Sequence, residues 1–250
     1  MYWRLEALQE RTRRRLNFAF AKREVKSSSL TARISFTFDD FPRSAYVNGG
    51  GILNRYSLQG TYYTAMGLMN TSNHLGDHFT PQDLTQLVHE GHEIGCHTFD
   101  HLSCPSVLGL LCRKNVGRNQ RAIEAVLPGY KLQNFAYPCG AVNVAAKWVL
   151  GSRFLTCRST YTGTNEDRID MALLLACKLY ARVSWESVQE LIEENTRRRS
   201  WLIFYTHDVR DNPSPYGCTP EFFEAAVKYA VSSGAQILTV RDVVGQLIQA

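Results

Sequence analysis

The sequence lacks several features that would place it in a special class of protein. No uncharged apolar run approaches the roughly 18 to 20 residues that a membrane-spanning helix needs, and no apolar segment follows the basic residues near Met1. The seven cysteines include no CxxC pair and are odd in number, which argues against a disulfide framework and for reduced thiols. We therefore expect no spanning segment, no secretory signal and a cytoplasmic location.

Internal repeats and low-complexity segments are also missing. The chain has 250 residues, of which 44% are apolar and 20% are charged, and this is the composition of an ordinary globular protein. Disorder, collagen and coiled coil are excluded by the same numbers. A length of 250 residues suits one large domain with a single core.

The positive net charge of +5 lies almost entirely at one end of the chain. Residues 1–30 carry eight basic and three acidic side chains, and residues 31–250 are balanced. A neutral body argues against a broad nucleic-acid surface, which needs basic groups over the whole contacting face. We therefore divide the chain into a basic arm (1–30) and a catalytic domain (31–250). Residues 1–26 form either a helix packed on the body or a peripheral anchor on anionic lipid.

Apolar runs rich in β-forming residues alternate with helix-period segments along the body. The predicted strands are Ile34–Phe38, Thr61–Ala65, Glu93–Cys96, Asn134–Tyr137, Phe154–Cys157, Leu202–Tyr205 and Gln236–Leu238. Thr80-Pro81 and Thr219-Pro220 predict helix starts, while Gly91 and Gly234 predict helix ends. This order indicates an α/β fold with a mostly parallel sheet, either open or closed into a barrel.

Ionisable side chains gather where three of these strands end. Asp39 and Asp40 follow the first strand, His97 follows the third with His101 four residues later, and His207 follows the sixth. Each feature has a structural explanation when taken alone, such as a pair of turn aspartates. Parallel strands bring their ends to one face, however, and two histidines with one carboxylate suit Zn²⁺ or another divalent cation acting as a Lewis acid.

A second pair of histidines, His74 and His78, has the same spacing as His97 and His101. It lies in a polar loop that no strand precedes, so we interpret these two side chains as solvated or facing a substrate. The spacing alone therefore does not predict a metal site.

Four segments of the sequence resemble, in order, motifs of the polysaccharide deacetylase family, which has a NodB-homology fold and includes carbohydrate esterase family 4. The segments are Thr37-Phe38-Asp39-Asp40, His97-Thr98-Phe99-Asp100-His101, Phe135-Ala136-Tyr137-Pro138-Cys139-Gly140 and Tyr205-Thr206-His207-Asp208. The resemblance spans about residues 33 to 245. It implies a distorted (β/α)7 barrel in a single domain, a divalent metal, and hydrolysis of an N-acetyl or sometimes O-acetyl group on a carbohydrate.

Position by position, the resemblance makes Asp40, His97 and His101 the metal ligands. Asp39 becomes the general base that deprotonates the attacking water, and His207 the acid that protonates the departing amine. The backbone N–H of Cys139 becomes a donor to the oxyanion. The resemblance implies zinc as the first choice of metal, with cobalt, nickel and manganese as other choices.

The sequence departs from the family pattern in three places. Ala136 stands where many members have an arginine that supports the catalytic aspartate, so another group must orient Asp39 or it is oriented less firmly. Cys139 replaces the usual tyrosine of the third motif. No clear copy of the fourth motif exists, and Asp167 and Asp170 are weak candidates for its acid, so the carboxylate partner of His207 is unidentified.

Three other functions remain open at this point. Cys139 with His207 as its base would make a thiol hydrolase. A carbohydrate-binding descendant of the fold would have lost catalysis, and a deformylase or a cyclic-amide hydrolase would act on a different acyl group. The expected substrate is an acetylated amino sugar of a surface polysaccharide, or its lipid-linked precursor in glycan assembly, and no nucleic-acid partner is expected.

Overall fold

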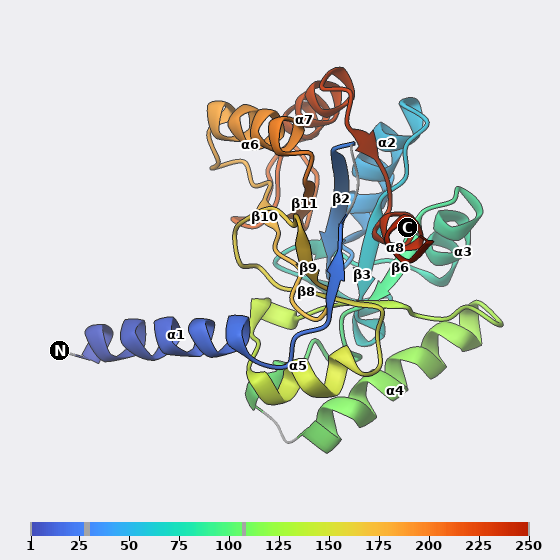
Figure 1. The fold of residues 1–250 in the computed structure, drawn as a ribbon. Coiled ribbons are helices and arrows are strands. Elements are labelled where there is room, and N and C mark those ends of the chain that lie inside the picture. The colour runs from blue at the N-terminus through green and yellow to red at the C-terminus, as the bar shows by residue number, and fades with distance from the viewer. Residues whose placement is uncertain (1, 28–30, 107–108, 250) are drawn as a thin grey trace.

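A curled sheet of parallel strands forms the centre of the molecule (Figure 1). The computed structural model describes residues 2–27, 31–106 and 109–249, with side chains from residue 9 onward. Along the sheet the strand order is β10-β11-β2-β3-β6-β7-β8, and β12 pairs with the first half of β2. The strands are β2 (Arg33–Asp39), β3 (Thr61–Thr64), β6 (Glu93–Cys96), β7 (Asn134–Ala136), β8 (Thr156–Arg158), β10 (Cys177–Lys178), β11 (Trp201–Thr206) and β12 (Gln236–Ile237).

The two edges of this sheet approach each other through the segment that precedes β10. The N–H of Leu174 donates to the carbonyl of Cys157 on β8, and the carbonyl of Leu174 accepts from Ser159. Three residues later, Cys177 pairs with Phe204 on β11. The sheet is therefore a curled half-barrel of parallel strands, and the predicted NodB-type α/β fold is confirmed.

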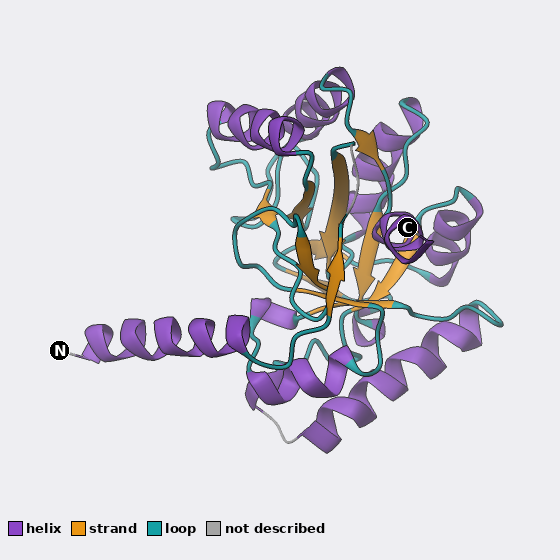
Figure 2. Ribbon diagram, in the orientation of Figure 1, coloured by secondary structure: helices purple, strands orange, loops and turns teal. Residues whose placement is uncertain are grey.

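Helices cover the outside of the sheet, as the alternating sequence pattern predicts (Figure 2). They are α2 (Gly51–Arg55), α3 (Pro81–His89), α4 (Gly109–Val126), α5 (Val144–Gly151), α6 (Trp185–Arg198), α7 (Pro220–Ser232) and α8 (Val240–Gln249). Thr80 caps α3 in a capping box with Asp83, and Thr219 caps α7. Gly91 and Gly234 follow the last turns of α3 and α7 with φ of +86° and +76°, a backbone conformation that favours glycine.

The first residues form a helix that extends away from the body, α1 (Tyr2–Ala19), as Figure 1 shows. The chain then forms β1 (Glu24–Lys26), which pairs antiparallel with β9 (Arg168–Asp170), and the remaining short strands are β4 (Ser72–Asn73) and β5 (Gly76–Asp77). Met1 and residues 28–30 of the predicted arm lie outside the described residues. None of the described helices is both long and apolar enough to cross a bilayer.

Most predicted strands differ from the observed ones by one residue at one or both ends, and the largest difference bears on the site. The sequence predicts a strand over Phe154–Cys157, but β8 begins at Thr156 and extends to Arg158. The N–H of Phe154 donates to the carbonyl of Leu150, so Phe154 belongs to the turn that follows α5 despite its apolar side chain. The strand therefore ends on a buried basic residue, which the predicted boundary left outside the sheet.

Candidate metal centre and active site

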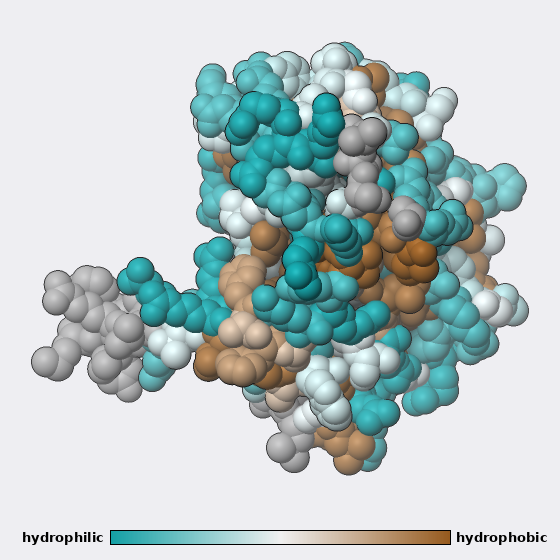
Figure 3. All heavy atoms as spheres, in the orientation of Figure 1, coloured by the Kyte–Doolittle hydropathy of each residue, from teal (hydrophilic) through white to brown (hydrophobic). Residues whose placement is uncertain are grey.

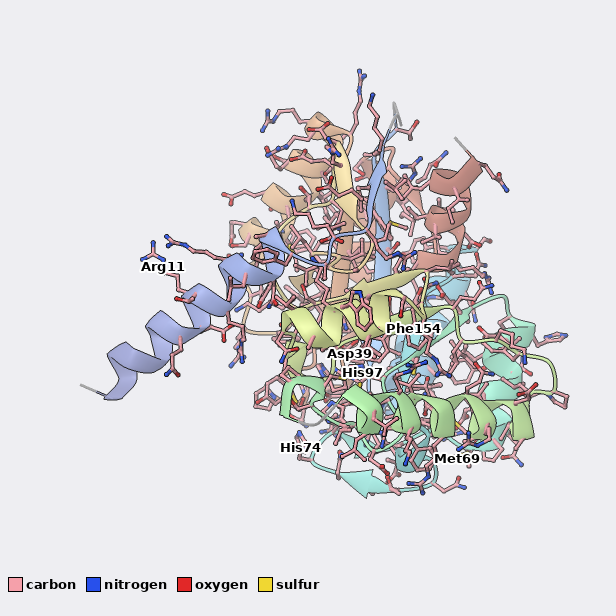
Figure 4. The ribbon with its side chains drawn as sticks, turned by 60° about the horizontal axis from the view of Figure 1, so that its bottom comes forward. Arg11, Asp39, Met69, His74, His97 and Phe154 are labelled. Atoms are coloured by element: carbon pink, nitrogen blue, oxygen red, sulfur yellow. The ribbon has the colours of Figure 1, made fainter. Side chains whose placement is uncertain are left out.

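The ends of the central strands surround a cleft of about 510 Å³. All six residues predicted from the sequence to carry chemistry line it: Asp39, Asp40, His97, His101, Cys139 and His207. The other lining residues are His74, Leu75, Gly140, Thr160, Tyr180, Tyr205 and Tyr216. Figure 4 shows Asp39 and His97 near the middle of the view, with His74 toward its lower edge. Segments far apart in the chain therefore meet in one place.

Asp40, His97 and His101 form a group with the geometry of a metal site. The Nε2 atoms of His101 and His97 lie 3.2 and 3.5 Å from Oδ1 of Asp40, and one ligand atom from each residue falls within 4.8 Å of the others. Oδ1 of Asp40 is buried and has no hydrogen-bond partner in the described part of the chain. A buried carboxylate oxygen left unpaired between two imidazoles fits a divalent cation such as zinc or cobalt.

The protonation of the two histidines suits metal binding. His97 Nδ1 lies 2.9 Å from the carbonyl oxygen of Ala136, and a proton on Nδ1 leaves Nε2 free to coordinate. Burial lowers the pKa of His97 to about 3 and also lowers the pKa of His101, so both rings are neutral. Burial, with the neighbouring charge of Asp39 adding to it, raises the pKa of Asp40 to about 6. A cation at this place would offset that cost of ionising Asp40.

Left-handed backbone conformations recur around the cleft. Asp40, Thr98, His101 and Cys139 have φ values of +61°, +61°, +51° and +57°. Residues with a Cβ seldom adopt this left-handed backbone conformation, and those that do are concentrated at functional sites. The hydroxyl of Thr98 accepts a hydrogen bond from the N–H of Leu102 at 2.7 Å, which closes the turn that carries His101.

A buried arginine holds Asp39. Nη2 of Arg158 lies 2.5 and 2.6 Å from the two carboxylate oxygens, and both side chains are almost completely buried. The guanidinium carbon also lies 5.1 and 5.0 Å from the ring centres of Tyr63 and Tyr205. Burial alone raises the pKa of Asp39, but the charge and the hydrogen bonds of Arg158 hold the pKa of this carboxyl below its ordinary value.

Arg158 supplies the positive charge beside Asp39 that an arginine at the position of Ala136 would supply in other members of the family. In the parallel pair of β7 and β8, Ala136 is the register partner of Arg158. Register partners on neighbouring strands point to the same side of the sheet, so the guanidinium reaches Asp39 from one strand further along. The sequence analysis missed Arg158 because the predicted strand ends at Cys157. The signal that could have identified Arg158 is a basic residue directly after an apolar strand.

Among the residues that the structure describes, a backbone carbonyl holds His207 and no carboxylate does. Its Nδ1 lies 3.2 Å from the carbonyl oxygen of Tyr216. The neighbouring Asp208 instead accepts hydrogen bonds from the N–H and hydroxyl of Ser214 and from Arg210, at 2.6 to 2.9 Å. Asp208 therefore orders the loop that presents Tyr216, and Tyr216 orients His207.

The two weak candidates for the acid of the fourth motif lie elsewhere. Asp170 pairs with Nζ of Lys147 at 2.5 Å, and the carbonyl of Asp167 accepts a hydrogen bond from Ser27, so both belong to the attachment of the N-terminal segment. Of the second histidine pair, His74 lines the cleft, whereas His78 is buried beside Pro42 and does not line it. The interpretation of a histidine that faces substrate thus fits His74 alone.

The thiol-hydrolase alternative finds little support in the geometry. Cys139 lines the cleft, but within the described residues it makes no hydrogen bond to His207. Burial and the charge of Asp40 raise the pKa of the Cys139 thiol, whereas a nucleophilic cysteine needs a lowered pKa.

Solved structures of similar fold come from carbohydrate esterases. The chitin deacetylase of Colletotrichum lindemuthianum is 15% identical with a TM-score of 0.61, over 87% of this chain and 89% of that one. An acetyl xylan esterase from Clostridium thermocellum, in complex with a cobalt ion, is 18% identical with a TM-score of 0.59, over 86% and 91%. A pseudoenzyme of the same esterase family from Bacillus anthracis is 11% identical with a TM-score of 0.57, over 88% and 68%.

At these identities the likeness establishes the fold. A search of curated proteins finds no match. The profile of the polysaccharide deacetylase family matches residues 26–153, just over half of the chain, and this segment contains Asp39, Asp40, His97 and His101. The chain therefore belongs to the polysaccharide deacetylase family.

Proposed function

We propose that this protein is a metal-dependent hydrolase that removes an N-acetyl or similar acyl group from an amino sugar. The observation that carries the proposal is the pairing of two carboxylates in different environments within one cleft. Asp40 presents an unpartnered oxygen to two histidines, and Asp39 is ionised beside Arg158. Carboxylates whose environments differ in this way take different chemical roles.

Asp40, His97 and His101 would hold the cation, with zinc as the first choice and cobalt, nickel or manganese as alternatives. When bound, the cation would act as a Lewis acid and lower the pKa of water. The carbonyl of Ala136 fixes His97 for this task, since its hydrogen bond to Nδ1 leaves Nε2 facing Asp40.

Asp39 would act as the general base. Arg158 keeps this carboxyl ionised despite its burial and fixes the plane of the carboxylate through both oxygens. A base held in this way takes a proton from the attacking water without first reorienting. The arginine itself is buried and acts on the reaction only through Asp39.

The amine that leaves must receive a proton, and His207 would supply it. The hydrogen bond between Nδ1 and the Tyr216 carbonyl leaves Nε2 as the atom that faces the cleft. The N–H of Cys139 would donate to the oxyanion of the tetrahedral intermediate. Water adds to the carbonyl carbon, the C–N bond breaks, and the products are a carboxylate and a protonated amine.

The cleft offers aromatic rings for a sugar. Tyr180, Tyr205 and Tyr216 line it, and rings of this kind stack on the apolar faces of sugar rings. Tyr62, Tyr63 and Tyr137 are buried in the core and do not line the cleft. A surface polysaccharide or its lipid-linked precursor as substrate, and the cytoplasmic location, remain predictions.

A carbohydrate-binding descendant without activity is the second candidate, because one solved structure of similar fold is a pseudoenzyme. Retention of both Asp39 and its buried arginine speaks for catalysis, since a binding site gains nothing from a charged base. A deformylase keeps the same residues and differs only in the acyl group removed.

The first experiment measures the metal content of the purified protein by elemental mass spectrometry, with and without added Zn²⁺. The wild type should hold about one divalent ion per chain, as expected for a single site of this donor set. His101→Ala should lose it, and His74→Ala, a histidine of the same cleft outside the ligand set, should keep it. Loaded protein is then assayed for release of acetate or formate from acylated amino sugars. Absence of metal from the wild type would refute the metal site, and bound metal without turnover on any glycan would favour the binding descendant.

A further inference from the structure

Three helices lie together along one side of the molecule. α1, α5 and α4 form the lower side in Figure 1, and all three come to the front in Figure 4. Nζ of Lys147 on α5 donates to the carbonyls of Asn17 and Phe20 at 2.7 and 2.9 Å, so the end of α1 is fixed to the body. Gly109, at the start of α4, packs closely against Val149 on α5, since a Cβ added to this glycine would lie 3.3 Å from the valine side chain. These contacts make the three helices one continuous surface.

Large apolar side chains are exposed along this surface. Six of the ten large hydrophobic residues that the described structure exposes belong to it: Leu16, Phe18, Phe20, Leu110, Leu111 and Trp148. Trp148 is 70% exposed although its neighbours Lys147 and Leu150 are buried, and Leu110 is 62% exposed. Figure 3 shows hydrophobic residues where α1 meets the body and at the lower tip where α4 begins. Clustering of this kind marks an interaction surface.

Basic side chains without acidic partners surround these apolar residues. Within the described chain, the following make no ion pair: Arg11, Arg14 and Arg15 on α1, Arg113, Lys114 and Arg121 on α4, and Arg153 after α5. Leu110, Leu111 and the four basic residues outside α1 line one shallow hollow of about 1170 Å³. We call the exposed residues of 11–20, Trp148 and this hollow the basic–apolar face.

Basic residues on the opposite side of the molecule are arranged differently. On α6, Arg197 pairs with Glu194, and Arg198 pairs with Glu166 and Glu194. On α7, Lys228 pairs with Glu224. Arg199, directly after α6, makes no ion pair within the described chain, but seven unpaired basic side chains gather on the face that also exposes the apolar side chains. This combination of charge and apolar surface is complementary to an anionic bilayer.

We propose that the basic–apolar face docks the protein on the surface of an anionic lipid bilayer. The arginines and the lysine would meet the lipid headgroups, while Trp148, Phe20 and Leu110 would enter the interfacial layer, where tryptophan is favoured. A soluble polyanion would satisfy the charges but leave six large apolar side chains in water. The bilayer accounts for both kinds of side chain.

This face adjoins the cleft. The side chain of Asn17 on α1 donates to the hydroxyl of Tyr161 at 3.2 Å, and the preceding residue, Thr160, lines the cleft. Leu102, which directly follows the candidate ligand His101 in the chain, lines the hollow. Docking would therefore hold the cleft close to the bilayer. If the proposed function is right, a glycan carried on a membrane lipid is the natural substrate class; docking itself does not depend on that function.

The test is co-sedimentation of the full chain with vesicles at low salt. Vesicles of equal parts phosphatidylcholine and phosphatidylglycerol are compared with vesicles of phosphatidylcholine alone. The variant Arg11→Gln/Arg14→Gln/Arg15→Gln should bind the anionic vesicles about 100-fold more weakly, since each basic residue near such a surface contributes about fivefold. The matched control Arg197→Gln/Arg198→Gln/Arg199→Gln loses the same charge from α6 and should bind like the wild type.

Tryptophan fluorescence separates docking from general attraction. Anionic vesicles should shift the emission of the wild type to shorter wavelength, and Trp148→Phe, which changes an exposed side chain, should lose most of that shift while still folding. The proposal is overturned if the wild type does not sediment with anionic vesicles, if the α6 control loses as much binding as the α1 variant, or if a soluble polyanion such as heparin is bound while vesicles are not. None of these readouts requires activity, so failure of the proposed function leaves them unaffected.

Discussion

Removal of Arg158 is expected to uncouple metal binding from turnover. Arg158→Ala leaves the carboxylate of Asp39, which is 3% exposed, without the two hydrogen bonds of 2.5 and 2.6 Å. Loss of one partner from a buried ion pair destabilises a protein by about 3 to 5 kcal/mol. Two hydrogen bonds to a charged group, at about 1.5 to 3 kcal/mol each, give a similar total. Such a loss is a large share of the stability of an ordinary domain.

The effect on activity follows from orientation. Without the guanidinium, the Asp39 carboxylate is free to rotate, and a displacement of about 1 Å of a reacting group costs on the order of 100-fold in rate. Asp40, His97 and His101 do not contact Arg158 through any hydrogen bond in the described residues, so metal content should stay unchanged. Urea unfolding, elemental analysis and kcat on a verified substrate measure the three quantities.

The register of β7 and β8 supplies a rescue experiment. Because Ala136 and Arg158 are register partners, an arginine at position 136 can approach Asp39 once Arg158 is removed. Ala136→Arg/Arg158→Ala should recover about tenfold in kcat over Arg158→Ala, part of the hundredfold orientation effect. Ala136→Arg alone should be destabilising, since it forces a second guanidinium into a filled, buried site. Wild-type kcat in metal-loaded Arg158→Ala would refute the reasoning.

Three further predictions follow from other parts of the molecule. Asp39→Asn should keep its metal and lose turnover, because only the base is removed; equal metal content with wild-type activity would contradict that role. Lys147→Met should cost about 3 kcal/mol in urea unfolding and expose the end of α1 to limited proteolysis, because Asp170 and the carbonyls of Asn17 and Phe20 lose the buried ammonium. Burial lowers the pKa of His92 to about 4 from 6.5. The ring of His92 accepts a hydrogen bond from the N–H of Gly60 and stays neutral in the folded protein, so the free energy of unfolding should fall as the pH drops below 6.5. Between pH 7 and 5 the wild type should lose about 2 kcal/mol more stability than His92→Gln. Equal losses in the two proteins would contradict the assignment.

The residues of the site were predictable from the sequence because each of them lies at the end of a strand that its own local segment predicts. Strand Glu93–Cys96 was predicted with its observed bounds, and the residues after β2, β6 and β11 reach one cleft because parallel strands end on the same side. Parts that depend on distant segments were not predictable. β10 has two residues, and the backbone groups before it are paired with β8, so no periodicity reveals it. The carbonyl of Tyr216 orients His207 across a loop ordered by Asp208, and a backbone atom carries no sequence signal.

Arg158 shows why a motif can be interrupted in sequence and complete in space. The Asp39 carboxylate needs a positive charge beside both of its oxygens. This requirement fixes where the charged group lies in space, at the level of the strand ends, but it does not fix which strand carries the arginine. β7 and β8 are parallel neighbours in register, so both deliver side chains to that level on the same side of the sheet. An arginine on either strand therefore serves the same carboxylate. Ala136 then gives no sign of a decayed site, and the hypothesis of a non-catalytic descendant loses one of the departures from the family pattern that supported it.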